Sequence, residues 1–204
     1  ISRDGTLVAY RQDGGNNNYG NVVAADTLTR KLTLNTQQWS FAAIHPNNND
    51  LFTTTTNGLH LTDLATGVVT PLYSASRISH PEVSADGQTV VATSLSVGDE
   101  VWTSEGRIVA FAYDAGAKSV GAPTTVADPA GATFAYYPSI SPDNQWVLYN
   151  QASSGSSYDN PNAELWITKL DGTGEPIHLT QADAPSTTYN SWPKWTPFAG
   201  AEPT

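Results

Sequence analysis

Short runs of β-branched and aromatic residues, separated by polar turn residues, dominate the chain from end to end. In the stretch 136–181 these runs fall at about 136–140, 145–151, 163–170 and 175–180, and each is long enough for one strand. No run keeps the apolar spacing of a helix for more than two turns. The pattern predicts an all-β protein in which neighbouring strands pair antiparallel.

A turn motif recurs along the chain and divides it into similar units. Its clearest copies are the Ser-Ala-Asp-Gly turn at 84–87 and the Ser-Pro-Asp-Asn turn at 141–144, each with a proline three residues before the serine. A copy without its front opens the chain at Ser2, and degenerate copies follow at His45 and Thr196. Four short strands in a repeat of roughly 40 to 55 residues are typical of a β-propeller blade.

A second set of turns, also built from Asp and Gly, follows the third strand of each unit. Copies stand at 63–67, 114–117 and 171–174, and a weaker copy at 26–30 lacks the glycine. Asp can accept backbone hydrogen bonds in such turns, and Gly takes positive φ without strain. Because these residues recur in each unit, whereas an active site is unique, we predict that Asp86, Asp143 and their equivalents are structural.

We therefore expect a β-propeller of four-stranded antiparallel blades, with about four blades present. Their approximate bounds are 1–38, 39–79, 80–135 and 136–190, with a further blade begun at 191–204. The first blade lacks its opening strand, and the chain contains no methionine, so we expect a part of a larger propeller. The alternative is a four-bladed ring closed by pairing of the segment around Trp195 with the first blade.

The proline, serine, Asp and Gly positions at 81–87 and 138–143 resemble the TolB-type, WD-like propeller repeat. The resemblance spans nearly the whole chain and is weak at 45–50 and at Phe198. It implies a periplasmic or extracellular bacterial protein whose propeller serves as a binding scaffold. The same repeat also occurs in propellers attached to prolyl-oligopeptidase-like hydrolases and in some lyases. The alternative is therefore a propeller domain of such an enzyme, with catalytic residues outside this segment.

Composition narrows the function classes further. The 204 residues carry a net charge of -10 and no cluster of Lys and Arg, which argues against binding to nucleic acid or to an anionic membrane. Cysteine is absent, so disulfides, thiolate metal sites and cysteine nucleophiles are excluded. No apolar run approaches the roughly 20 residues of a membrane-spanning helix. Common hydrolase, zinc-protease and nucleotide-binding motifs are missing too, so the sequence favours a non-catalytic role and no catalytic residue is assigned.

Three stretches are longer than hairpin closure needs, at 13–20, 96–106 and 152–162. They connect the second and third strands of their units, so we expect them on one face of the propeller, opposite the Asp-Gly turns. Long polar loops on a rigid scaffold are where binding groups collect. We predict a binding surface there for a protein partner or larger assembly, formed by Asp99, Glu100, Trp102, Tyr158, Asp159 and Asn160.

The last of these loops also offers side-chain oxygens at close spacing, as a hard cation such as calcium requires. The candidate calcium ligands are Asp159, Asn160, Asn162 and Glu164. A solvated turn with Asx hydrogen bonds is the alternative, because the match to an EF-hand loop is loose. No other cofactor is predicted.

Overall fold

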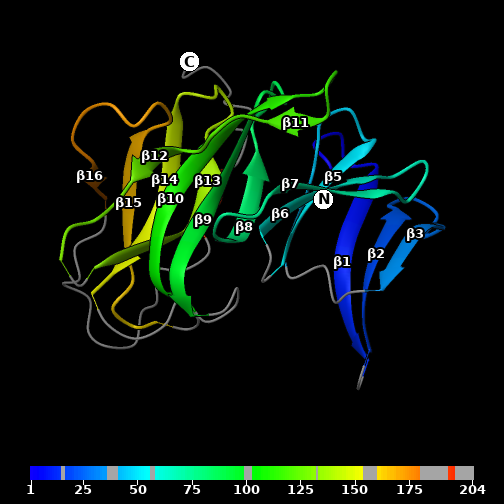
Figure 1. The fold of residues 1–204 in the computed structure, drawn as a ribbon, viewed down its shortest axis with the longest axis horizontal. Helices are drawn as coiled ribbons and strands as arrows, with labels where there is room; N and C mark the ends of the chain where they lie inside the picture. Colours follow the sequence, from blue (N-terminus) through cyan, green and yellow to red (C-terminus); the bar gives the residue numbers. More distant parts are fainter. Residues whose placement is uncertain are drawn as a thin grey trace, which may run out of the picture.

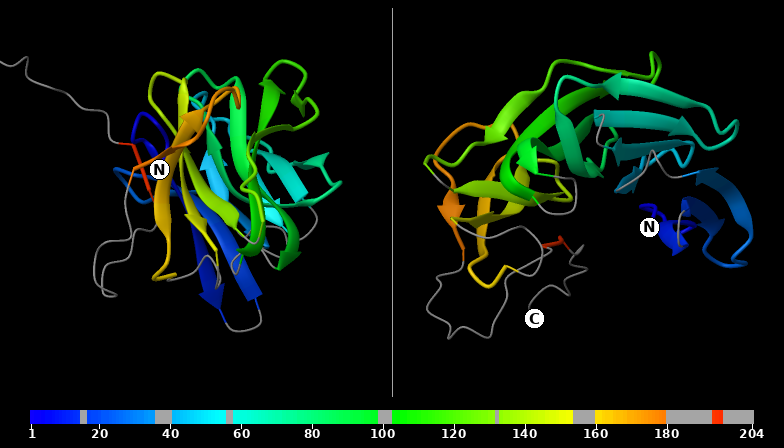
Figure 2. Two further views of the ribbon diagram at one scale, coloured as in Figure 1. Left: turned by 90° about the vertical axis from the view of Figure 1, so that its left-hand side faces the viewer. Right: turned by 60° about the horizontal axis from the view of Figure 1, so that its bottom comes forward.

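The computed structural model describes residues 1–14, 17–35, 41–55, 58–98, 103–131, 133–153, 160–179 and 193–195. These residues form four antiparallel sheets joined by turns, and they contain no helix. Figure 1 shows the sheets side by side, and Figure 2 shows that they follow an arc around a central axis. The predicted all-β fold of antiparallel propeller blades is thus confirmed.

Blade one has three strands, β1 (Leu7–Gly14), β2 (Asn17–Ala24) and β3 (Arg30–Asn35). Among the described residues no strand pairs with the inner edge of β1, in agreement with the expected lack of an opening strand in this blade. The predicted loop at 13–20 is wrong, because β1 and β2 stay paired up to Gly14 and Asn17. In the turn without glycine, Leu28 takes a left-handed conformation with φ of 54°.

Blade two has the complete order of four strands from the axis outward. They are β4 (Ala42–Ile44), β5 (Asp50–Thr55), β6 (Gly58–Asp63) and β7 (Val69–Tyr73). Its sheet packs against blade one through Val22, Ile44 and Leu51, with several half-buried apolar side chains around them.

Blade three is built on the longest hairpin of the protein. Its strands are β8 (Arg77–Val83), β9 (Thr89–Gly98), β10 (Thr103–Asp114), β11 (Ser119–Val120) and β12 (Thr124–Ala127). Both β11 and β12 pair with β10 at the outer edge. The predicted loop at 96–106 is wrong, because strand pairing continues to Gly98 and Thr103. In Figure 1 this hairpin and that of blade one extend toward the lower side of the molecule.

Blade four repeats the simple meander. Its strands are β13 (Phe134–Ile140), β14 (Trp146–Ala152), β15 (Glu164–Lys169) and β16 (Ile177–His178), within a few residues of the runs predicted from sequence.

Apolar side chains fill the spaces between blades, because strands of a blade send alternate residues to its two neighbours. In β9, Val90 and Ala92 face blade two while Val91 faces blade four. The core between blades two and three contains Phe52, Leu59, Leu61, Ile78, Val109, Phe111 and Tyr113. The core between blades three and four contains Ile108, Ala110, Val126, Ala127, Ala135, Ile140, Val147 and Tyr149.

The ring is not closed at blade one by the described residues. Residues 193–195 form no strand, and the indole Nε1 of Trp195 donates to the carbonyl oxygen of Ser139 in β13 at 3.0 Å. The sequence-based alternative, a four-bladed ring in which this segment pairs with β1, is therefore not what the described strands form.

Candidate functional site: the central cavity

The innermost strands β4, β8 and β13 enclose a cavity of about 600 Å³ at the centre of the arc. Most of its wall comes from residues 42–44 and Pro46, from residues 81–85 and from residues 139–142. Ile1, Arg3, Ala9, Lys194 and Trp195 also line it. Polar turn residues thus lie at one end of the cavity, since the strands run into the Ser-x-Asp turns there. We call this space the central cavity.

Three rings lie one or two positions before the wall segments, one from each blade with an inner strand, and they are not part of the cavity wall. The ring centroids of Phe41 and His80 lie 3.7 Å apart, and those of His80 and Tyr137 lie 4.2 Å apart. Each residue is four positions before the first residue of its turn, at His45, Ser84 and Ser141. The repeat therefore carries one ring per blade to the same level of the propeller axis.

A bulge in the inner strand places two of these rings, those of His80 and Tyr137. His80 and Tyr137 have φ of 51° and 54°, and the pairing of β8 with β9 and of β13 with β14 shifts register at these positions. Proline follows each of them, at Pro81 and Pro138, and proline has no N–H to give to a regular ladder. The proline of the repeat thus coincides with a bulge that turns an aromatic side chain toward the axis.

His80 is a neutral packing group in this arrangement. It is 8% exposed, and burial lowers its pKa well below the ordinary value for histidine, with a smaller contribution from Lys194. The hydroxyl of Ser79 lies 2.5 Å from its Nδ1. This contact resembles the pairing of a nucleophile with a base, but Ser79 is 0% exposed, so a substrate cannot reach it in this conformation.

The charged groups of the cavity wall join blades three and four. The Glu82 carboxylate accepts hydrogen bonds from the Ser139 hydroxyl and the Ile140 backbone N–H, both at 3.0 Å. Lys194 forms an ion pair with the other oxygen of Glu82. Arg3 is exposed at the turn end of the cavity. These groups can bind and orient polar partners, and Glu82 is already committed to holding neighbouring inner strands together.

The Ser-x-Asp turns at the end of the cavity have the predicted structural role. Ser84 Oγ donates to Asp86 Oδ1 at 2.6 Å and accepts from the Thr89 N–H at 2.9 Å. Asp86 Oδ1 also accepts from the Gln88 N–H at 2.9 Å. These hydrogen bonds, first that from Ser84, hold the pKa of Asp86 below its ordinary value. Gly87 takes the left-handed conformation, with φ of 75°.

Of the residues predicted to form a binding surface, Asp99, Glu100, Trp102, Tyr158 and Asp159 lie outside the described residues. Asn160 is described and is 3% exposed, with its side-chain oxygen accepting from the Asn162 N–H at 2.9 Å. The adjacent Ala163 packs in a small core with Phe134, Tyr136, Tyr137 and Ala152. The end of this loop is therefore anchored to the blade.

Glu164, the fourth candidate calcium ligand, lies at the start of β15. Its Oε2 accepts from the Trp166 indole at 3.3 Å and lies 3.4 Å from His178 Nε2. Among the described residues no group of three or more His, Cys, Asp or Glu side chains is placed to hold a metal ion. A calcium site that includes Asp159 remains a prediction.

The row formed by Phe41, His80 and Tyr137 was missed by sequence reasoning. Its signal is present in the repeat, because aligning the copies places an aromatic or imidazole ring at the same position in each.

Solved structures with a similar fold are TolB-type propellers and propeller domains of enzymes. A putative TolB from Agrobacterium tumefaciens matches with a TM-score of 0.66 and 16% identity, over 87% of this chain and 62% of that one. TolB from Acinetobacter baumannii matches with a TM-score of 0.63 and 17% identity, over 87% and 41%. An oligogalacturonate lyase in complex with manganese matches with a TM-score of 0.55 and 15% identity, over 87% and 50%.

At these identities the likeness establishes the fold, which is that of a TolB-like β-propeller. This chain spans less than two thirds of the length of these structures. No family model matches the chain, and no curated protein matches it. Within the part of the chain that the structure describes, no helix is long and apolar enough to cross a membrane.

Proposed function

We propose that this chain is a non-catalytic scaffold that binds a partner protein in the central cavity, as part of an exported bacterial protein or assembly. The observation that carries the proposal is a cavity of about 600 Å³ between three inner strands, lined by Arg3, Lys194 and Trp195. A cavity of this volume suits a few side chains of an inserted segment. The repeat motif and the similar fold of TolB structures support the exported setting.

The chemistry of the wall favours binding over catalysis. His80 and Ser79 are buried, and Glu82 is held by three donors from blade four and the 193–195 segment. The half-buried Trp195 lines the cavity and offers an aromatic surface of the kind that anchors partner side chains. Arg3 adds a cation at the exposed end of the cavity, where it would meet an acidic or carbonyl-rich segment.

The experiment is site-specific photo-crosslinking in the source organism. A benzoylphenylalanine introduced at Arg3, which lines the cavity, should give a discrete adduct of one size after irradiation. The matched control is the same residue at Ala117, an exposed turn position of blade three away from the central cavity. A scaffold with its site in the cavity predicts the adduct from position 3 and none from position 117.

The alternative is a propeller domain of a hydrolase or lyase, which the similar folds of an oligogalacturonate lyase and an acylaminoacyl peptidase keep open. In that case the full-length protein should cleave peptides or uronic-acid polymers, and position 3 should give no protein adduct. That pair of results would replace the scaffold proposal with the enzyme.

A further inference from the structure

Another cavity, of about 470 Å³, lies between β12 with the segment after it in blade three and strands β14 and β15 of blade four. We call it the rim cleft. Its apolar wall includes Ala127, Pro129, Ala130 and Pro176, and its polar and aromatic lining consists of Asp128, Thr133, Tyr149, Gln151, Trp166 and Glu175.

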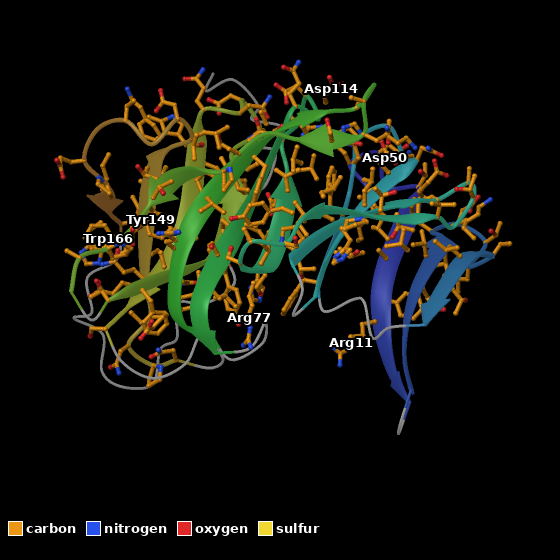
Figure 3. All side chains as sticks on the ribbon, in the orientation of Figure 1. Arg11, Asp50, Arg77, Asp114, Tyr149 and Trp166 are labelled. Carbon is orange, nitrogen blue, oxygen red and sulfur yellow. The ribbon has the colours of Figure 1, made fainter. Side chains whose placement is uncertain are left out.

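Two aromatic side chains of blade four stand next to each other in the rim cleft. Tyr149 of β14 is paired with Trp166 of β15, and Figure 3 shows the two side chains together at the edge of the sheet. His178 stacks on the indole, with ring centroids 4.5 Å apart and planes at 15°. The indole Nε1 donates to Glu164. These contacts fix the orientation of the indole before any ligand arrives.

The charge of the rim cleft is negative. Asp128 and Glu175 line it, while none of its described lining residues is Lys, Arg or His. Arg107 lies 3.8 Å from Asp128, but both side chains are more than half exposed, at 52% and 57%, so solvent screens this pair strongly. The rim cleft thus combines a fixed indole, an apolar wall and two carboxylates. The carboxylates would repel an anion and attract a cation.

We propose that the rim cleft binds an organic ammonium ion, such as a quaternary ammonium head group. A cation over an aromatic face is attracted by the ring quadrupole, and carboxylates nearby add to this attraction. His178 covers one face of the indole, and the ligand meets the part of Trp166 that lines the rim cleft. The apolar wall suits the alkyl groups around the nitrogen, and the site is distinct from the central cavity in place and in chemistry.

Choline and its neutral isostere 3,3-dimethyl-1-butanol test the proposal with the whole chain. Saturation-transfer NMR should detect choline binding, and the neutral alcohol, which has the same shape without the charge, should bind at least about fivefold more weakly. Equal affinities for the two would overturn the proposal. A preference for neutral methyl glycosides over choline would also overturn it and would point to a saccharide site.

Variants locate the binding. Trp166→Leu should abolish choline binding, whereas Trp146→Phe, in the same blade but outside the rim cleft, should leave it unchanged. Glu175→Gln removes a charge from an exposed side chain and should weaken choline binding several-fold without affecting folding. Choline affinity that is unchanged in both Trp166→Leu and Glu175→Gln would show that the ligand binds elsewhere and would refute the assignment.

Discussion

The Nε2 atom of His45 lies 3.0 Å from the carbonyl oxygen of Gly87, and a Cβ atom on Gly87 would fall only 2.4 Å from the same nitrogen. These residues join the turns of blades two and three. At the interface of blades three and four the turns are joined by a different hydrogen bond. There the side-chain oxygen of Asn144, the residue equivalent to Gly87, accepts from the Ala85 N–H at 2.7 Å. The residue equivalent to Ala85 in blade two is Pro46, which has no N–H to donate, so the imidazole reaches across instead.

This relationship predicts coupling between positions 45 and 87. Asn tolerates the left-handed conformation, so Gly87→Asn should suffer mainly from the conflict with the His45 ring, at about 1 to 3 kcal/mol. In a His45→Ser background the same change should cost less, because the ring is gone. Urea unfolding of the two single variants and the double variant measures a coupling free energy, expected to be at least about 1 kcal/mol. Additive effects would contradict the steric account.

Acid should destabilise the protein through its turn aspartates. Hydrogen bonds from serine and backbone donors lower the pKa of Asp86 and of Asp143 in the folded state. A lowered folded pKa means that the stabilisation is present above the unfolded pKa of about 4 and is lost as the pH falls through the folded pKa. The free energy of unfolding should therefore decrease below about pH 4.

The test measures the free energy of unfolding against pH for the wild-type chain and for the double variant Asp86→Asn/Asp143→Asn. The variant should be less stable at pH 7 and should lose less stability between pH 5 and pH 3, since two of the responsible carboxyl groups are gone. Identical pH profiles for the two proteins would assign acid sensitivity to other groups.

Lys118 should matter more than an ordinary surface lysine. Its ammonium group lies 2.6 Å from Asp63 and 3.3 Å from Asp50, which is 1% exposed and also accepts from the Tyr113 hydroxyl at 3.0 Å. Lys118→Met leaves the Asp50 carboxylate buried without its cation, which should cost about 1 to 3 kcal/mol. Lys31→Met, on the exposed side of β3, should change thermal stability little. Equal effects would show that the Asp50 cluster contributes nothing special.

The sequence repeat made the β-propeller fold predictable. The structural role of the turn residues was predicted correctly from the repeat. Ser84, Asp86 and Gly87 act as their residue types require, because a turn depends on neighbours a few positions away. The lengths of the hairpins were not predictable in the same way. Polar residues at 13–20 and 96–106 resemble loop residues, yet cross-strand pairing continues through most of both stretches.

The site depended on contacts between blades, which sequence spacing within one blade cannot give. Phe41, His80 and Tyr137 are distant in sequence and meet only because three inner strands surround one axis. Glu164 also has contacts that spacing within the sequence did not indicate. Its carboxylate lies beside Trp166 and His178, while its role as a calcium ligand stays a prediction.

The central claim is that this chain binds a partner protein in the central cavity. It is tested most directly by measuring the affinity of the chain for the partner that crosslinking identifies. Calorimetric titration should compare the wild-type chain with Ala43→Trp, which fills the central cavity, and with Ala117→Trp in an exposed turn. Arg3→Glu provides a second cavity variant on an exposed side chain, in case the larger change disturbs folding. A cavity-binding scaffold predicts at least a tenfold loss of affinity, about 1.4 kcal/mol, in the cavity variants and none in Ala117→Trp. Undiminished binding by folded Ala43→Trp and Arg3→Glu would contradict the account.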